Sequence, residues 1–145
     1  MYHLPVFNKL IICFIFIGSL TSSKLYAQSI LGRWYQVTVK QYFTDEGAKK
    51  YGKPFIETDM SSIGTVVSEF KSDHTYVTSS VNQDGASRTY SGSWTLDGNV
   101  LTMTAQKATA TVKSSITITS GILVMETVYP DGNITRKVEI TFKKG

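Results

Sequence analysis

Two arginines, Arg88 and Arg136, are the residues whose charge and positions could bind a ligand. Each lies in a stretch where polar and apolar residues alternate, and each shares a face with apolar or aromatic side chains. An inward guanidinium costs on the order of several kcal/mol of desolvation unless it is paired or hydrated. The pattern therefore indicates a water-filled interior or a site that holds an anionic group such as a carboxylate. Alternatively, both arginines lie at a rim and reach solvent through their stems.

No set of residues in the sequence forms a recognisable catalytic group. His74 is the only histidine beyond His3, and it lies in a turn without a cysteine or second histidine nearby, so a turn residue is favoured over a metal ligand. Asp73 and Asp97 also lie in turns, and nothing pairs them for acid–base work. No Gly-x-Ser-x-Gly motif is present. We therefore expect no enzyme, no cofactor and no metal.

A β-sheet must position these residues, because the chain after Ser29 alternates with a period of two and is interrupted by turn residues. The predicted strands are Leu31–Tyr42, Ile63–Lys71, His74–Val81, Ala86–Leu96, Val100–Gln106, Val112–Thr119, Ile122–Tyr129 and Ile134–Lys143. One long connection, Phe43–Ser62, follows the first strand. Thr44 could cap a short helix in it, and we expect loop from Pro54 onward.

Short connections favour pairing of each strand with its neighbour, and closing the last strand onto the first removes both exposed edges. The sequence thus predicts an all-β fold, an eight-stranded antiparallel up-and-down β-barrel with a long first loop and no C-terminal helix. Such a barrel is either packed inside or able to hold one small ligand. An open sandwich is the alternative, but it would need longer connections.

Alternation of side chains sorts the interior into two layers. The lower layer is an aromatic floor of Trp34, Trp94, Phe70 and Phe142, for which core packing is favoured over a ligand site. The upper layer is smaller, more polar and positively charged. It also holds Ser80 and Ala105, and it includes the candidate ligand-binding residues Arg88, Tyr90, Arg136, Lys40 and Ser114. A bulge in the first strand could reverse the face of Lys40.

The first 27 residues have the layout of a signal peptide: Lys9, then an apolar run, then small residues before a cut after Ala27. The domain proper is then 28–145, exported to the periplasm or secreted. The only cysteine, Cys13, lies in the apolar run and follows the large residue Ile12, whereas a lipid-anchor motif has a small residue there. We therefore expect no stable membrane anchor. Removing this segment leaves 13 basic and 11 acidic residues. This balance calls for no nucleic-acid partner.

Several motifs resemble the lipocalin-like domains of bacteria, a family of calycin-type β-barrels. "LGRWYQV" is similar to the Gly-x-Trp opening of lipocalins, and "GSWTLDGNVLT" from Gly92 resembles the central motif of the bacterial domains. Phe70, Asp73 and Tyr76 match a preceding piece, although His74 stands where that pattern has glycine. In lipocalins a cation packs over the first tryptophan, and here Lys143 or Lys144 could do so. The resemblance implies a small barrel that binds something apolar.

Two functions remain open from the sequence. The first is an exported, non-enzymatic barrel that binds a small apolar or amphipathic ligand, anionic ligands included, in its upper part. The second is a periplasmic protein-binding module, an inhibitor or assembly partner with a filled barrel. A cavity of a few hundred Å³ ringed by Arg88 and Arg136 would favour the first, and a dry, closed upper barrel would favour the second.

Overall fold

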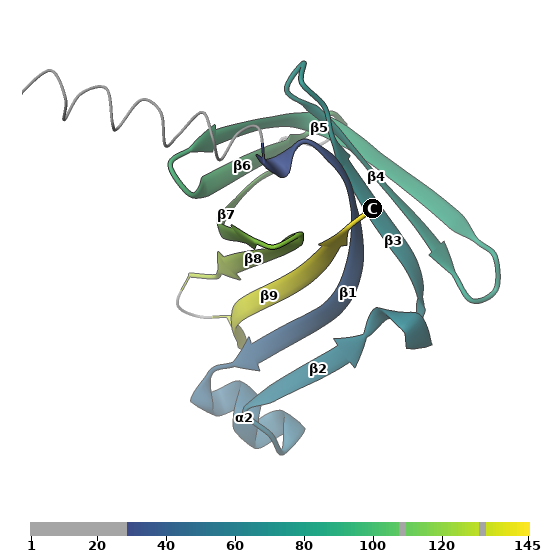
Figure 1. The fold of residues 1–145 in the computed structure, drawn as a ribbon. Coiled ribbons are helices and arrows are strands. Elements are labelled where there is room, and N and C mark those ends of the chain that lie inside the picture. Colours follow the sequence, from purple (N-terminus) through teal and green to yellow (C-terminus); the bar gives the residue numbers. More distant parts are fainter. Residues whose placement is uncertain (1–28, 108–109, 131–132) are drawn as a thin grey trace, which may run out of the picture.

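The computed structural model describes residues 29–107, 110–130 and 133–145, so the predicted signal peptide lies outside the described residues (Figure 1). The elements, in chain order, are β1 (Gly32–Phe43), α2 (Asp45–Tyr51), β2 (Phe55–Asp59), the 3-10 turn η1 (Met60–Ser62), β3 (Gly64–Phe70), β4 (Thr75–Asn82), β5 (Ser87–Asp97), β6 (Val100–Ala105), β7 (Thr111–Thr119), β8 (Ile122–Val128) and β9 (Thr135–Lys144). Within the described ranges, no helix has the length and apolar character needed to cross a membrane.

The sheet closes into a barrel because β1 pairs with β9 along most of its length, from Trp34 opposite Lys144 to Phe43 opposite Thr135. Around the barrel the order is β1, β3, β4, β5, β6, β7, β8, β9 and back to β1, all antiparallel (Figure 1). The predicted eight-stranded antiparallel up-and-down β-barrel is confirmed.

Strand β1 reverses its faces at Val37. Gln36 lies opposite Phe142 and Thr38 opposite Thr141, so Val37 has no partner of its own on β9. One extra residue moves every later side chain to the other face of the sheet. The half of β1 that begins with Trp34 therefore turns its even-numbered residues inward, whereas the half beyond the bulge turns them outward.

The connection Phe43–Ser62 is more regular than expected. Helix α2 begins as predicted, because the Thr44 Oγ1 accepts a hydrogen bond from the Gly47 amide at 3.3 Å. The expectation of loop after Pro54 is wrong, because Phe55–Asp59 forms β2 along the half of β1 that β3 does not cover. A five-residue strand is too short to show a period-two pattern, and it forms because β1 offers this free edge.

A cluster of buried side chains fills the end of the barrel where β1 begins and β5 ends. Trp34 has no exposed surface, and Trp94 and Phe70 are each 2% exposed. The cluster consists of Ile30, Trp34, Phe70, Tyr76, Trp94, Leu101, Ile116, Leu123, Met125 and Phe142. Burial of a large aromatic side chain contributes roughly 4–6 kcal/mol as an upper estimate from its area. This cluster is the main stabilising element and closes one end of the barrel.

Candidate functional site

The barrel interior contains a cavity of about 330 Å³ that borders the core cluster. It is lined by inner-face residues from seven strands and by Ala110 and Tyr129 beside them: Gln36, Ser68, Phe70, Tyr76, Thr78, Met103, Ala105, Ala110, Val112, Ser114, Met125, Thr127, Tyr129, Val138, Ile140 and Phe142. The lining is mostly apolar, and apart from two tyrosines none of these residues is ionisable. This volume lies at the lower end of those of small-molecule pockets.

Pairs of hydroxyl groups supply most of the cavity's polarity. The Ser68 and Thr78 hydroxyls lie 2.9 Å apart across β3 and β4, and the Ser114 and Thr127 hydroxyls lie 2.7 Å apart across β7 and β8. Each pair satisfies itself, so an apolar guest meets no unpaired buried hydroxyl there. Each hydroxyl also has a second lone pair or a rotatable proton that could turn toward a polar group of a ligand.

Tyr76 is a lining residue whose position depends on a glycine. It lies opposite Gly92 on the neighbouring strand. A Cβ at position 92 would come 2.8 Å from the Tyr76 Cε1 and would also overlap the Thr104 carbonyl oxygen. Burial raises the pKa of the Tyr76 hydroxyl above its ordinary value of 10. The glycine therefore makes room for an aromatic wall between the core and the cavity.

The two tryptophans seal the floor and are fixed by their own polar atoms. The Trp34 Nε1 donates to the Ile30 carbonyl at 2.7 Å, and the Trp94 Nε1 donates to the Thr75 carbonyl at 3.0 Å. The Phe70 ring meets Trp94 edge-on at 5.9 Å between centroids. Neither tryptophan lines the cavity. The arrangement supports core packing as the role of both residues.

Lys144 is the cation that packs on the first tryptophan. Its Nζ lies 4.9 Å from the centre of the Trp34 ring and donates to the Ser29 carbonyl at 3.2 Å. The prediction that Lys143 or Lys144 would occupy this position is confirmed for Lys144.

Of the candidate ligand-binding residues, only Ser114 lines the cavity. Arg88 and Tyr90 precede Gly92 on β5 and lie outside the stretch that pairs with β6, and both are exposed, Tyr90 by 55%. Arg136 is exposed at an irregularity where β9 passes Tyr42 and Phe43 of β1. The expectation that the arginines ring one cavity is wrong, because the sheet opens between β5 and β6 at the height of Arg88 and the irregularity displaces Arg136.

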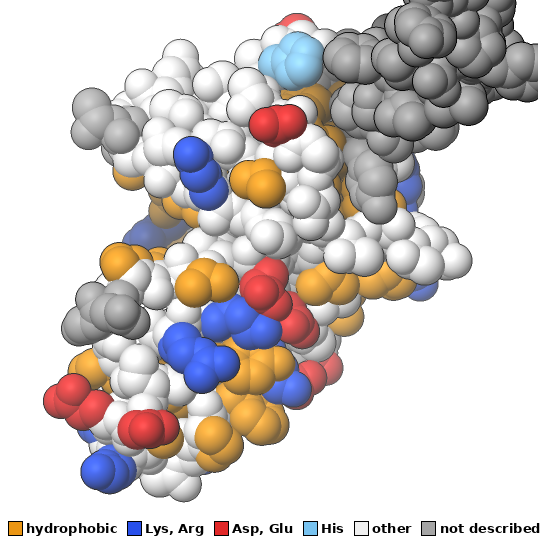
Figure 2. Space-filling model, turned by 90° about the vertical axis from the view of Figure 1, so that its left-hand side faces the viewer, with side chains coloured by type: hydrophobic (Ala, Val, Ile, Leu, Met, Phe, Trp, Pro, Cys, Tyr) orange, Lys and Arg blue, Asp and Glu red, His pale blue; other side chains and the backbone are white. Residues whose placement is uncertain are grey.

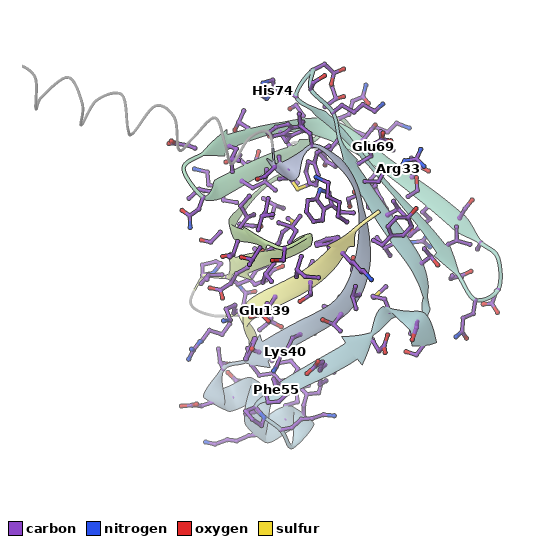
Figure 3. The ribbon with its side chains drawn as sticks, viewed as in Figure 1. Arg33, Lys40, Phe55, Glu69, His74 and Glu139 are labelled. Carbon is purple, nitrogen blue, oxygen red and sulfur yellow. The ribbon has the colours of Figure 1, made fainter. Side chains whose placement is uncertain are left out.

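The inward position expected for Lys40 is also wrong, because the bulge at Val37 turns it to the outer face. There its Nζ lies 3.7 Å from the Glu57 Oε2 of β2 and 4.3 Å from the centre of the Phe55 ring (Figure 3). Lys137 completes the cluster from β9, with its Nζ 4.5 Å from the Tyr42 ring centre and 2.7 Å from the Glu126 Oε2. Figure 2 shows basic, acidic and hydrophobic side chains crowded together on the lower half of one face. The contacts of Lys40 with Glu57 and Phe55 hold β2 against β1 at the outside of the barrel.

His74 lies against the floor, with its ring centre 4.8 Å from that of Trp94 and a positive φ of 64°. Among the residues that the structure describes, no group of three or more His, Cys, Asp and Glu side chains could hold a metal ion. The alternation of residues predicted most of the cavity wall. It did not reveal that Gln36, Met103, Met125 and Ile140 border open space, because a pattern of faces carries no information about volume.

Comparison with known proteins identifies the family of the chain. The sequence model of the lipocalin-like domain matches residues 30–125. The chain belongs to the lipocalin-like domain family. This lipocalin-like domain has no match among curated proteins.

Similar solved structures show the same fold at low sequence identity. A lipocalin-like protein from Bacteroides uniformis has a TM-score of 0.54 at 14% identity, covering 81% of this chain and 99% of that one. An uncharacterised protein from Bacteroides eggerthii has a TM-score of 0.53 at 11% identity, covering 80% and 99%. Lobster apocrustacyanin A1 has a TM-score of 0.52 at 11% identity, covering 88% and 67%. The neighbours from Bacteroides match this lipocalin-like domain over nearly their whole length.

Proposed function

We propose that this lipocalin-like domain binds a small apolar or amphipathic molecule inside its barrel and does not act as an enzyme. The observation that carries the proposal is the cavity of about 330 Å³, closed below by the aromatic floor and lined mainly by apolar side chains. An apolar molecule gains dispersion contacts and leaves water when it enters such a space. The cavity favours ligand binding over the alternative of a filled, protein-binding barrel.

The residues that would hold the ligand come from opposite walls. Met103 and Met125 are flexible and polarizable, which suits an irregular apolar guest. Ile140 and Phe142 form the wall from β9, and the hydroxyl pairs of Ser68 with Thr78 and Ser114 with Thr127 could orient a single polar group. The signal-peptide layout of the first 27 residues supports the further proposal that the protein works outside the cytoplasm, in the periplasm or secreted.

A cavity-filling variant tests the proposal. Ala105 lines the cavity at the end of β6, so Ala105→Phe should fill part of it. Thr117→Phe places the same side chain on the exposed outer face of β7 and is the matched control. Binding of the uncharged fluorescent probe N-phenyl-naphthylamine is measured by titration. We expect the Ala105 variant to bind at least tenfold more weakly than the wild type, while the Thr117 variant binds like the wild type. Equal binding by all three proteins would contradict the proposal.

A further inference from the structure

We propose that the ligand is an amphipathic anion whose head group binds Arg88 at the rim while its apolar part occupies the cavity. This inference rests on the proposed function and adds the chemical class of the ligand and its orientation. Its basis is a second hollow, separate from the cavity, whose lining includes Val66, Ser80 and Arg88 from the inner face of the sheet.

The second hollow has a volume of about 280 Å³ and lies at the ends of β3, β4 and β5 beside η1. Its apolar walls include Ile63 and Val81, which are 49% and 45% exposed. The lining residues are Met60, Ile63, Gly64, Thr65, Val66, Ser80, Val81, Asn82, Ala86 and Arg88. Arg88 is the one charged side chain in this set. The hollow thus combines exposed apolar surface with a single positive charge.

The hollow and the cavity follow each other along the same strands. On β3, Val66 lines the hollow and Ser68 lines the cavity; on β4, Ser80 lines the hollow and Thr78 the cavity. Residues two apart on a strand lie about 7 Å from each other on one face. Val66, Ser80 and Arg88 are cross-strand neighbours of one another in turn. A molecule of moderate length could therefore extend from the cavity to the guanidinium group.

Arg88 is free to bind an anion. Among the described residues, no carboxylate lies within 4.0 Å of its guanidinium group, whereas Arg33, Lys40 and Lys137 each have an acidic partner. A guanidinium group presents a planar fork of donors that matches a carboxylate or phosphate. Charge complementarity thus selects an anionic head group at this position.

The cavity itself favours keeping that charge at the rim. None of its lining residues is cationic, so a carboxylate placed among Met103, Met125 and Ile140 would lose its hydration without gaining a counter-charge. An anionic amphiphile gains most when its apolar part is inside and its head is at Arg88. Arg136 lines neither hollow, which makes it the matched control for charge alone.

Three ligands with one tail and different heads test the inference: decanoate, decanol and decyltrimethylammonium, each competed against N-phenyl-naphthylamine at neutral pH and low salt. We expect decanoate to bind roughly threefold to fivefold more tightly than decanol, the effect of an exposed ion pair, and the cation to bind most weakly. Arg88→Gln should bring the affinities for decanoate and decanol together, and Arg88→Lys should retain part of the difference. Arg136→Gln should keep the wild-type preference. High salt should reduce the preference in the wild type.

The outcomes separate this inference from the proposed function. Equal affinity of the wild type for decanoate and decanol, or the same loss in Arg136→Gln as in Arg88→Gln, would overturn the role of Arg88 while leaving cavity binding intact. A preference that depends on Arg88 but is insensitive to Ala105→Phe would support the anion site and refute occupation of the cavity. Binding of none of the three ligands would count against both.

Discussion

The Nζ of Lys144 lies over the indole ring of Trp34, 4.9 Å from its centre, so the end of the last strand is fastened to the start of the first. The same ammonium group donates to the Ser29 carbonyl. One side chain therefore links the closure of the barrel to its floor.

Lys144→Met should destabilise the protein by about 0.5–1 kcal/mol, since exposed cation–π contacts contribute that much. Urea unfolding followed by tryptophan fluorescence measures the change. Lys143→Met is the control, because among the described residues the adjacent lysine makes no cation–π contact with either tryptophan. Equal effects of the two substitutions would show that the Lys144 contact contributes nothing specific.

Gly92→Ala should be among the most damaging single-methyl additions in the domain. The new Cβ would overlap the Thr104 carbonyl oxygen and press on the Tyr76 ring, so we expect a loss of roughly 2–4 kcal/mol and weaker probe binding. Gly98→Ala, at a turn with φ of 58° and no atom within 4 Å of the new Cβ, should cost only about 1–2 kcal/mol. Thermal unfolding compares the two. A smaller loss at position 92 than at position 98 would contradict the crowding.

The turn before β4 should carry an acid-sensitive contribution to stability. The Thr75 hydroxyl and amide donate to Asp73 Oδ1 at 2.6 Å and 3.0 Å, and these hydrogen bonds, with the hydroxyl first, hold the pKa of the Asp73 carboxyl below its ordinary value of 3.8. Because the folded pKa is depressed, the contribution is present above pH 3.8 and is lost as the pH falls through the lower folded value.

Thr75→Val should move the pKa of Asp73 upward toward 3.8, which NMR titration of its carboxyl carbon can measure. The stability advantage of the wild type over this variant should shrink as the pH falls below about 4. Thr117→Val, on the exposed face of β7, should leave the Asp73 titration unchanged. An unaltered Asp73 pKa in Thr75→Val would refute the assigned hydrogen bonds.

The hydroxyl pair of Ser114 and Thr127 should behave as a unit. Ser114→Ala removes one partner and should cost about 1–2 kcal/mol, because the Thr127 hydroxyl loses its hydrogen bond inside the cavity wall. The double variant Ser114→Ala with Thr127→Val should lose less than the sum of the two single changes. Chemical unfolding of the four proteins completes the cycle. Strict additivity would mean that the pair is not coupled.

The sequence predicted the barrel because its turns and its period-two pattern are local signals. The turn at Ser120 and Gly121 is an example: both residues have positive φ, and their hairpin joins β7 to β8 as expected. β2 was not predicted, because it forms only by pairing with the part of β1 that β3 leaves free, and its own five residues carry no strand pattern.

The candidate site was harder to predict, for two physical reasons. Lys40 faces outward because one unpaired residue, Val37, reverses the alternation of β1, and no local signal reports where such a residue stands. Arg88 lies on the expected face, but pairing between β5 and β6 stops at Gly92, so the expected interior is an open rim at that height. Face can be predicted from periodicity, whereas the extent of closure depends on the lengths of neighbouring strands.

The end of β5 that extends past its neighbour has a consequence for how such a protein can diversify. Ser87–Tyr90 carries Arg88 and Tyr90 but none of the residues of the aromatic floor. Under the proposed binding of a head group at Arg88, substitutions there would alter which molecule binds without changing the buried cluster that stabilises the fold. The proposed ligand selectivity and the stability of the fold would then depend on separate segments of one strand, so that evolution or protein design could change the first without the second.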